Sequence, residues 1–314
     1  MTAFAMGFVL LAQSLASPTA ILMPRVEGPW WTIARNPDLG PDSGENQVSA
    51  NFSVFQAADG TWQLWAHLVG TKRGEKGRLL YRWEGRKLTE PDWKPMGIMM
   101  EADTNFGETS GGLQSPFVVK HRDQFYMFYG DWHHICLARS WDGKTFARVL
   151  NADGLSGMFG EGYHGNTRDA VVLLVGNTFY LYYTFATSER AVVFARASTD
   201  LSTWSAPTAV AAGGAAGSGS SSADGPHILY HPEEGQYYLF RTHPSTGPEE
   251  YMTSVYRSPN PLDFGVDDDK YRVGTLPLEV VRIVRHEGEY FIVSPLSGLQ
   301  GYRAARLEWV REIP

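Results

Sequence analysis

The sequence lacks several residue patterns that commonly build a functional site. It contains 314 residues but a single cysteine, Cys136, which excludes an intramolecular disulfide framework and any metal site built from cysteines. Cys136 lies in an apolar run, where a small buried side chain is expected rather than a nucleophile. No glycine-rich phosphate loop, serine-hydrolase elbow or zinc motif occurs. We therefore expect no metal and no cofactor, and nothing indicates a structural calcium ion.

Positive charge is also scarce. The formal net charge is −7, and the basic residues form no cluster along the chain, which argues against a nucleic-acid partner. Sustained helical periodicity is missing too, whereas aromatic residues reach 13% and the chain holds 33 Gly and 18 Pro. This combination predicts an all-β protein of many short strands.

The apolar run at the N-terminus is short. Ala3 to Ala12 cannot span a bilayer, and the small residues that follow offer a cleavage point, so residues 1–20 resemble a secretory signal. A signal predicts a secreted or periplasmic protein with no membrane contact after export. No Lys or Arg precedes Arg25, which leaves an apolar arm packed on the domain as the alternative. Residues 21–47 are rich in proline and predict an extended surface segment, with an edge strand at Trp30 to Ala34.

A repeat of about 55 residues governs the rest of the chain. Residues 164–185 contain an Arg-Asp pair, an apolar run, a Gly-Asn turn and a second run that alternates aromatic and aliphatic residues, which predicts a β-hairpin. The same layout recurs four more times, with spacings of 63, 54, 58 and 53 residues between the aromatic residues that open each second strand. These residues are Trp62, Phe125, Phe179, Tyr237 and Tyr290.

The repeat predicts a five-bladed β-propeller over residues 48–314, with three to four antiparallel strands per blade. One small sheet has two apolar faces and cannot bury both alone, whereas radial packing of five sheets buries all of them. We expect one domain and a monomer. The low-complexity segment 211–223 is expected to bury no apolar surface and to form a mobile loop, either a rim over a site or a surface insertion.

Polar residues stand at the starts of the predicted inner strands. In a propeller these starts converge on one mouth of the central channel, where charged side chains are poorly solvated. Such charges are expected either to pair with an opposite charge or to take part in binding or catalysis. The residues concerned are Asn51, Gln114, Arg168, Asp169, Asp224, His227 and Glu279.

Two of these starts carry recognisable motifs. Asn166 to Asp169 resembles the Arg-Asp-Pro motif of the five-bladed propeller glycoside hydrolases, the group of families 43, 32, 68, 117 and 130, with Ala170 in place of proline. Asp224 to His227 resembles the Glu-Cys-Pro motif of the same group. The separations of Asn51, Asp169 and Asp224, which are 118 and 55 residues, also fit the group.

The resemblance implies three catalytic positions, two of them substituted. Asn51 stands where the relatives carry the aspartate that serves as base or nucleophile, and an amide cannot accept the proton. Asp224 stands where a glutamate serves as general acid. Asp169 matches the aspartate that positions the substrate and tunes the acid. The hypothesis is a family 43-like hydrolase that acts on a carbohydrate, with Asp224 as acid and Asp169 as its modulator.

Glycoside hydrolysis ordinarily needs two carboxyl groups, so Asn51 leaves three alternatives open. The base can come from a loop, for which the candidates are Asp38, Asp42, Glu45 and Glu108. Phosphate can attack without a base, as in a glycoside phosphorylase. Otherwise the propeller binds carbohydrate without cleaving it.

Further substrate contacts are expected around the same mouth. An aromatic side chain can stack on a sugar ring, and histidine and acidic side chains can bind hydroxyl groups. Beside Arg168, the candidates are Glu108, Gln114, Trp132, His133, Glu161, His164, His227 and Glu279, the last of which can also stabilise the channel through Arg168.

Overall fold

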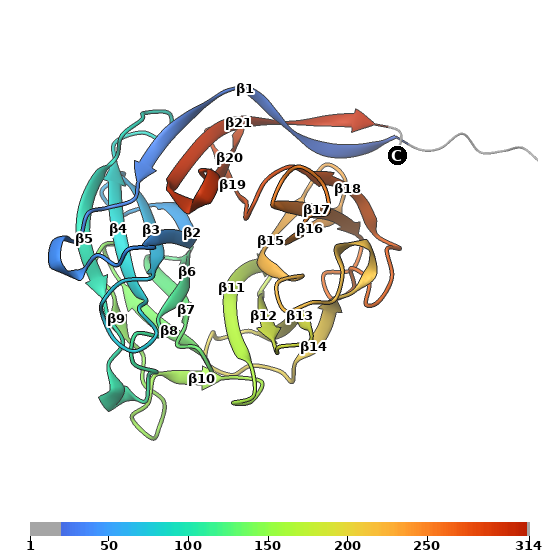
Figure 1. The fold of residues 1–314 in the computed structure, drawn as a ribbon. Coiled ribbons are helices and arrows are strands. Elements are labelled where there is room, and N and C mark those ends of the chain that lie inside the picture. The colour runs from blue at the N-terminus through green and yellow to red at the C-terminus, as the bar shows by residue number, and fades with distance from the viewer. Residues whose placement is uncertain (1–19, 313–314) are drawn as a thin grey trace, which may run out of the picture.

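The computed structural model describes residues 20–312, and its strands form five small antiparallel sheets arranged in a ring (Figure 1). The predicted all-β, five-bladed propeller is confirmed. The predicted signal at residues 1–20 falls on residues 1–19, which lie outside the described part of the chain, and stays a prediction. No helix within residues 20–312 is long and apolar enough to cross a membrane.

Each blade is a meander whose first strand lies nearest the axis. Blade one comprises β2 (Val48–Gln56), β3 (Trp62–Val69), β4 (Leu79–Gly85) and β5 (Lys94–Met100). Blade two comprises β6 (Gln114–His121), β7 (Gln124–Gly130) and β8 (Ile135–Ser140), and both β9 (Ala147–Arg148) and β10 (Gly157–Phe159) pair with β8. Blade three comprises β11 (Asn166–Val175), β12 (Thr178–Ala186), β13 (Ala191–Ser198) and β14 (Thr208–Ala211).

Blade four comprises β15 (Asp224–His231), β16 (Gln236–Pro244), β17 (Tyr251–Ser258) and β18 (Arg272–Leu276). Blade five comprises β19 (Arg282–His286), β20 (Glu289–Pro295), β21 (Gly301–Glu312) and, from the other end of the chain, β1 (Ile21–Arg35). The loops contain four short 3₁₀ turns, η1 (Gly40–Asp42), η2 (Thr104–Phe106), η3 (Gly214–Ala216) and η4 (Ser297–Leu299).

The hydrophobic core is divided among the joints between blades. Each of five clusters of buried side chains draws its members from two neighbouring blades, and one of them joins blade five to blade one. In that cluster Phe52 of β2 packs against Tyr302 of β21, with ring centroids 4.6 Å apart. Apolar residues on both faces of each sheet are therefore buried by radial packing, as the sequence predicts.

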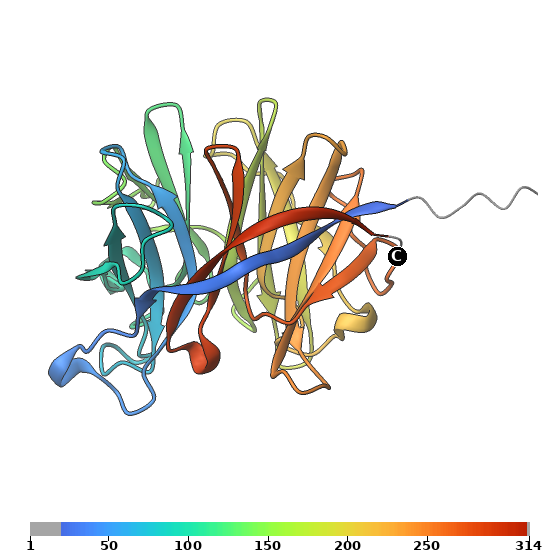
Figure 2. The ribbon, with the colours of Figure 1, turned by 90° about the horizontal axis from the view of Figure 1, so that it is seen from above.

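The N-terminal strand closes the ring. β1 pairs antiparallel with β21 from Ile21, opposite Glu312, to Arg35, opposite Gly301, so the start of the described chain completes the last blade. Figure 2 shows the two strands running side by side along the outside of the ring. The edge strand predicted at Trp30 to Ala34 is part of this longer strand.

The low-complexity segment 211–223 packs more closely than its composition suggests. Four of its alanines are buried, namely Ala211, Ala212, Ala216 and Ala223. The expectation that the segment buries no apolar surface is therefore wrong. The physical reason is the fully buried Arg241 of β16, whose guanidinium donates hydrogen bonds to the backbone carbonyls of Gly213, Gly217 and Ser222.

Candidate active site

A repeated backbone irregularity places side chains at the axial mouth. In blades one to four, the register between the first and second strands shifts near the start of the first strand. The shifts follow Ser49, Gln114, Arg168 and Asp224. Such bulges bend a strand and re-aim its side chains. Ser115, Asp169 and Gly225 lie in these bulges with positive φ angles of 53°, 62° and 49°, and Val280 precedes β19 with a φ of 40°.

The bulges surround a cavity on the axis of the ring, which we call the axial pocket. Six of the residues predicted from the sequence line it, namely Asn51, Gln114, Arg168, Asp169, Asp224 and Glu279. A second cavity, the side cavity, adjoins it and shares Arg78, Arg168 and Asp224 with it. Ser220 and Ser221 of the low-complexity segment line the side cavity, which places this segment at the rim of the site.

Asp169 is fully buried and its carboxylate is fully bonded. Oδ1 accepts hydrogen bonds from the Asn51 amide and the Ser115 hydroxyl, each at 2.5 Å, and Oδ2 accepts one from the Gly225 N–H at 3.0 Å. The guanidinium of Arg168 lies 3.4 Å from Oδ2. Burial alone would raise the pKa of Asp169, but Arg168 and the three hydrogen bonds outweigh burial and lower it. Asp169 is therefore a fixed negative charge beneath the pocket.

Asp224 differs from Asp169 because, within residues 20–312, its side chain has a single hydrogen-bonding partner. Arg168 donates a hydrogen bond to its Oδ1 at 2.5 Å, and 24% of the Asp224 side chain is exposed to the pocket. Burial raises the pKa of Asp224, and the negative charge of Asp169 adds to this effect despite Arg168. One oxygen of Asp224 therefore remains available to a ligand.

Glu279 is the third carboxyl group of the axial pocket. Within residues 20–312, no group donates a hydrogen bond to its side chain, and the expected contact with Arg168 does not form. Burial raises the pKa of Glu279 to about 7, and the charges of Glu250 and Asp224 contribute. Glu279 can therefore hold or release a proton near neutral pH.

Three further lining residues, which the sequence did not indicate as part of the site, lie at the ends of second and third strands. His67 lies near the end of β3, Arg78 immediately precedes β4, and Tyr251 begins β17. Nδ1 of His67 accepts a hydrogen bond of 3.1 Å from the Ser115 N–H, and burial lowers the pKa of His67 to about 3. The repeat could have pointed to these residues. In each meander the second strand ends, and the third begins, at the same mouth where the first strand starts.

Several residues predicted to bind the substrate line neither cavity. Their side chains bind other residues instead. The Glu108 carboxylate is buried in bonds to Arg148 and the Tyr129 hydroxyl. Glu161 binds Arg196 and the hydroxyl of Tyr183 in blade three. Nε2 of the buried His227 accepts a hydrogen bond from the Ile283 N–H.

The aromatic candidates lie on the loops around the mouth rather than in the pocket lining. Trp132 lies beneath two cationic side chains, the His133 ring contacts Tyr163, and the His164 ring packs edge-on against Phe185. Among the loop candidates for a base, Asp42 pairs with Arg73 and Asp38 binds the η1 turn. Neither they nor Glu45 and Glu108 line the axial pocket.

Comparison with known proteins gives matches in structure only. No protein-family model and no curated protein matches the chain. A thermostable family-43 glycoside hydrolase aligns at 18% identity over 88% of this chain and 92% of its own, with a TM-score of 0.60. An endo-arabinase from Bacteroides thetaiotaomicron aligns at 12% identity over 90% of this chain and 97% of its own, with a TM-score of 0.63. The chain has the fold of these propellers.

A family-32 β-fructofuranosidase from Bombyx mori shares the same propeller. It aligns at 15% identity over 90% of this chain and 62% of its own, with a TM-score of 0.60. The resemblance seen in the sequence is thus confirmed at the level of the fold. At these identities, the chemistry of this propeller has to be argued from its own side chains.

Proposed function

We propose that this propeller hydrolyses a glycosidic bond of an oligo- or polysaccharide in the axial pocket. The observation that carries the proposal is the carboxyl pair of Asp224 and Glu279, which line one cavity in contrasting environments. Two carboxyl groups are what glycoside hydrolysis requires. Glu279 supplies the second group that Asn51 cannot, and the loop candidates are not needed.

The two environments suggest which group carries the proton. The pKa of both groups is raised, but Asp224 binds a guanidinium, which favours its ionised form, whereas Glu279 accepts no hydrogen bond from residues 20–312 and has a pKa of about 7. A pair whose environments differ in this way divides the acid and base roles. Glu279 is therefore the general acid of the proposal, and Asp224 is the carboxylate that activates water or attacks the sugar. This reverses the role that the sequence resemblance implies for Asp224.

Asp169 and Asn51 act through other groups in this proposal. Asp169 holds Arg168, which in turn holds Asp224, and the Asn51 amide donates to Asp169. Asn51 is therefore a positioning residue at the place where relatives carry a base. Its amide keeps the buried aspartate bonded without adding another negative charge.

The test compares leaving groups on a panel of aryl glycosides and natural glycans. A poor leaving group needs the acid, so Glu279→Gln should lower kcat about 10²–10⁴-fold on natural glycans and much less on dinitrophenyl glycosides. Asp224→Asn should abolish turnover of both substrate types, with restoration by added azide. If the Asp224→Asn variant is as active as the wild type, this carboxyl pair does not carry out the reaction.

Two other outcomes would select the alternatives that the sequence leaves open. Turnover that requires inorganic phosphate in the wild type would identify a glycoside phosphorylase. Binding on a glycan array that Asp169→Ala removes, with no turnover of any substrate, would identify a carbohydrate-binding propeller. Export of the protein remains a separate proposal, tested by N-terminal sequencing of the mature chain.

A further inference from the structure

Arg78 is a half-buried cation that pairs with no carboxylate of the described chain, residues 20–312. Its side chain lines both the axial pocket and the side cavity. It donates one hydrogen bond, to Oε1 of Gln114, which is a neutral acceptor. Among residues 20–312, no acidic side chain lies within ion-pair distance of its guanidinium. Burial and the neighbouring charge of Arg168 lower the pKa of Arg78, and the more distant charges of Asp169 and Asp224 offset this only in part.

Other buried arginines of this propeller are compensated. Arg168 binds Asp169 and Asp224. Arg282, which is 3% exposed, donates to four backbone carbonyls, and Arg241 donates to three. A guanidinium carries five N–H donors, so Arg78 keeps most of its donors for a ligand.

Arg78 and Lys76 both pack on the Trp132 ring, and we call these three residues the cationic wall. The guanidinium carbon of Arg78 lies 4.8 Å from the centroid of the Trp132 ring, and Nζ of Lys76 lies 4.6 Å from the same centroid. Trp132 has a φ of 93°, which is unusual for a bulky residue, and its backbone pairs with Thr167 of β11. The Trp132 backbone is therefore held between blades two and three, and its indole ring faces the Arg78 guanidinium of blade one.

We propose that Arg78, assisted by Lys76, binds an anionic group carried by the sugar, either a carboxylate or a sulfate ester. The substrate class is then an acidic oligosaccharide or polysaccharide. Arginine suits this role because its planar fork matches two oxygens of such a group. The inference deepens the proposed hydrolysis and rests on it only in placing the sugar in the axial pocket.

A group on the sugar fits this wall better than free phosphate. Phosphate brings between one and two negative charges, and the negatively charged Asp169 lies in the same pocket, together with Asp224 and Glu279. A sugar-borne carboxylate brings one charge. The anion would thus face Arg78 while the glycosidic bond faces Glu279 and Asp224.

Binding is measured by calorimetry with D-galacturonate, D-glucuronate and galactose 6-sulfate, beside neutral D-galactose and D-glucose and inorganic phosphate. The wild-type protein is used, because these monosaccharides contain no glycosidic bond and therefore stay intact. At least one acidic sugar should bind about tenfold or more tightly than its neutral counterpart. Equal affinity for acidic and neutral sugars would overturn the inference, as would binding of phosphate alone.

Variants of the same protein show whether Arg78 is responsible for the preference for acidic sugars. Arg78→Gln should remove the preference for the acidic sugar, and Arg78→Lys, which keeps the charge but loses the fork, should retain part of it. Arg86→Gln removes an exposed arginine of the same blade and should leave the preference unchanged. Thermal unfolding of each variant shows whether it is folded, and the preference surviving in folded Arg78→Gln would contradict the inference.

The design separates this inference from the proposed function. If no glycan is cleaved but the acidic sugar binds through Arg78, the hydrolase proposal fails and the anion site stands. If neutral glycans are cleaved and the acidic probes bind no better, the hydrolase proposal stands and the anion site fails.

Discussion

Three acidic side chains of the axial pocket differ chiefly in how many donors surround them. Asp169 accepts three hydrogen bonds and lies beside Arg168, Asp224 accepts one, and Glu279 accepts none from residues 20–312. A buried carboxylate without donors favours its protonated form. The pKa of Asp169 is accordingly lowered, while those of Asp224 and Glu279 are raised. A fixed charge thus lies beneath a pair that can exchange protons.

The Glu279 carboxyl should make stability depend on pH. Its pKa rises from 4.5 to about 7 on folding, so ionisation opposes the folded state and stability falls as pH rises through this window. Glu279→Gln removes that penalty and should stabilise the protein at pH 8 by about 1–2 kcal/mol, allowing for solvent screening. The gain should disappear near pH 4, where glutamate is protonated in both states. Urea denaturation at the two pH values measures this, and an equal gain at both would contradict it.

The buried pair of Arg168 and Asp169 leads to a second prediction. Asp169→Asn leaves Arg168 with less compensation and replaces an acceptor that the Ser115, Asn51 and Gly225 donors all use. Breaking a buried pair from one side costs about 3–5 kcal/mol of unfolding free energy.

The matched control for that substitution is Asp224→Asn, which removes one bond from a partly exposed carboxylate and should cost much less. Chemical denaturation of both variants at pH 7 gives the comparison. A similar cost for the two substitutions would mean that Asp169 is not the structural anchor of the site.

The sequence indicated part of this pocket and missed another part for a geometric reason. Asn51, Arg168, Asp169, Asp224 and Glu279 were found because the starts of inner strands can be located from the repeat. His67, Arg78 and Tyr251 lie at other strand ends, and a repeat does not tell which of their side chains face the axis. The sequence also could not show that no donor within residues 20–312 reaches Glu279, since this depends on contacts between blades.

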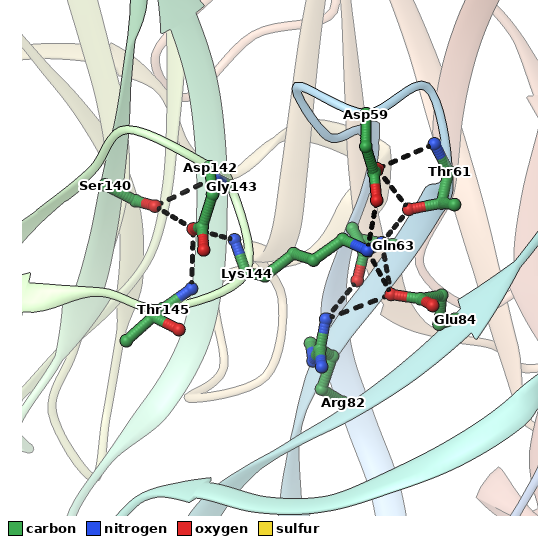
Figure 3. Close-up of polar contacts among 10 residues, drawn as sticks. All are labelled: Asp59, Thr61, Gln63, Arg82, Glu84, Ser140, Asp142, Gly143, Lys144 and Thr145. Atoms are coloured by element: carbon green, nitrogen blue, oxygen red, sulfur yellow. Dashed lines mark hydrogen bonds and ion pairs between the residues drawn. The ribbon is translucent and has the colours of Figure 1, made fainter.

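At the scale of strands and turns, one polar cluster joins two blades on the face away from the pocket. Nζ of Lys144, in the turn after β8, lies 2.6 Å from the Asp59 carboxylate in the β2–β3 turn and 2.8 Å from Glu84 of β4 (Figure 3). Gln63 and Arg82 extend the network inward from Glu84. Lys144 is therefore the cation that links blade two to blade one at this face.

Removing that cation should weaken the joint modestly. Isolated surface pairs contribute about 0–1 kcal/mol each, so Lys144→Met should cost about 1 kcal/mol, and added salt should shrink the difference. Lys87→Met is the control, because the Lys87 side chain is 72% exposed and forms its ion pair with Glu90 in its own turn. Urea denaturation at low and high salt measures both. A larger cost that does not respond to salt would indicate that Lys144 acts by packing.

For the whole molecule, the repeat was sufficient to predict the ring but not the way it closes. Five similar hairpins determine the number of blades, because each small sheet needs a neighbour on both faces. The fourth strand of blade five comes from the other end of the sequence, where residues 21–35 show no hairpin pattern. The sequence predicts only a short edge strand at Trp30 to Ala34, and the pairing of β1 with β21 reveals that the strand is longer and completes blade five.

If β1 closes the ring, weakening it should destabilise every blade rather than one edge. Ile33 of β1 is fully buried in the cluster that joins blades five and one, and Ile33→Ala should cost about 2–5 kcal/mol. The matched control, Glu27→Ala, changes an exposed residue of the same strand and should cost little. Hydrogen exchange should then speed up in β12, on the far side of the ring, as much as in β20. Faster exchange confined to β1 and β21 would contradict this prediction. It would mean that the remaining blades keep their stability when β1 opens, so that the ring does not depend on its closing strand.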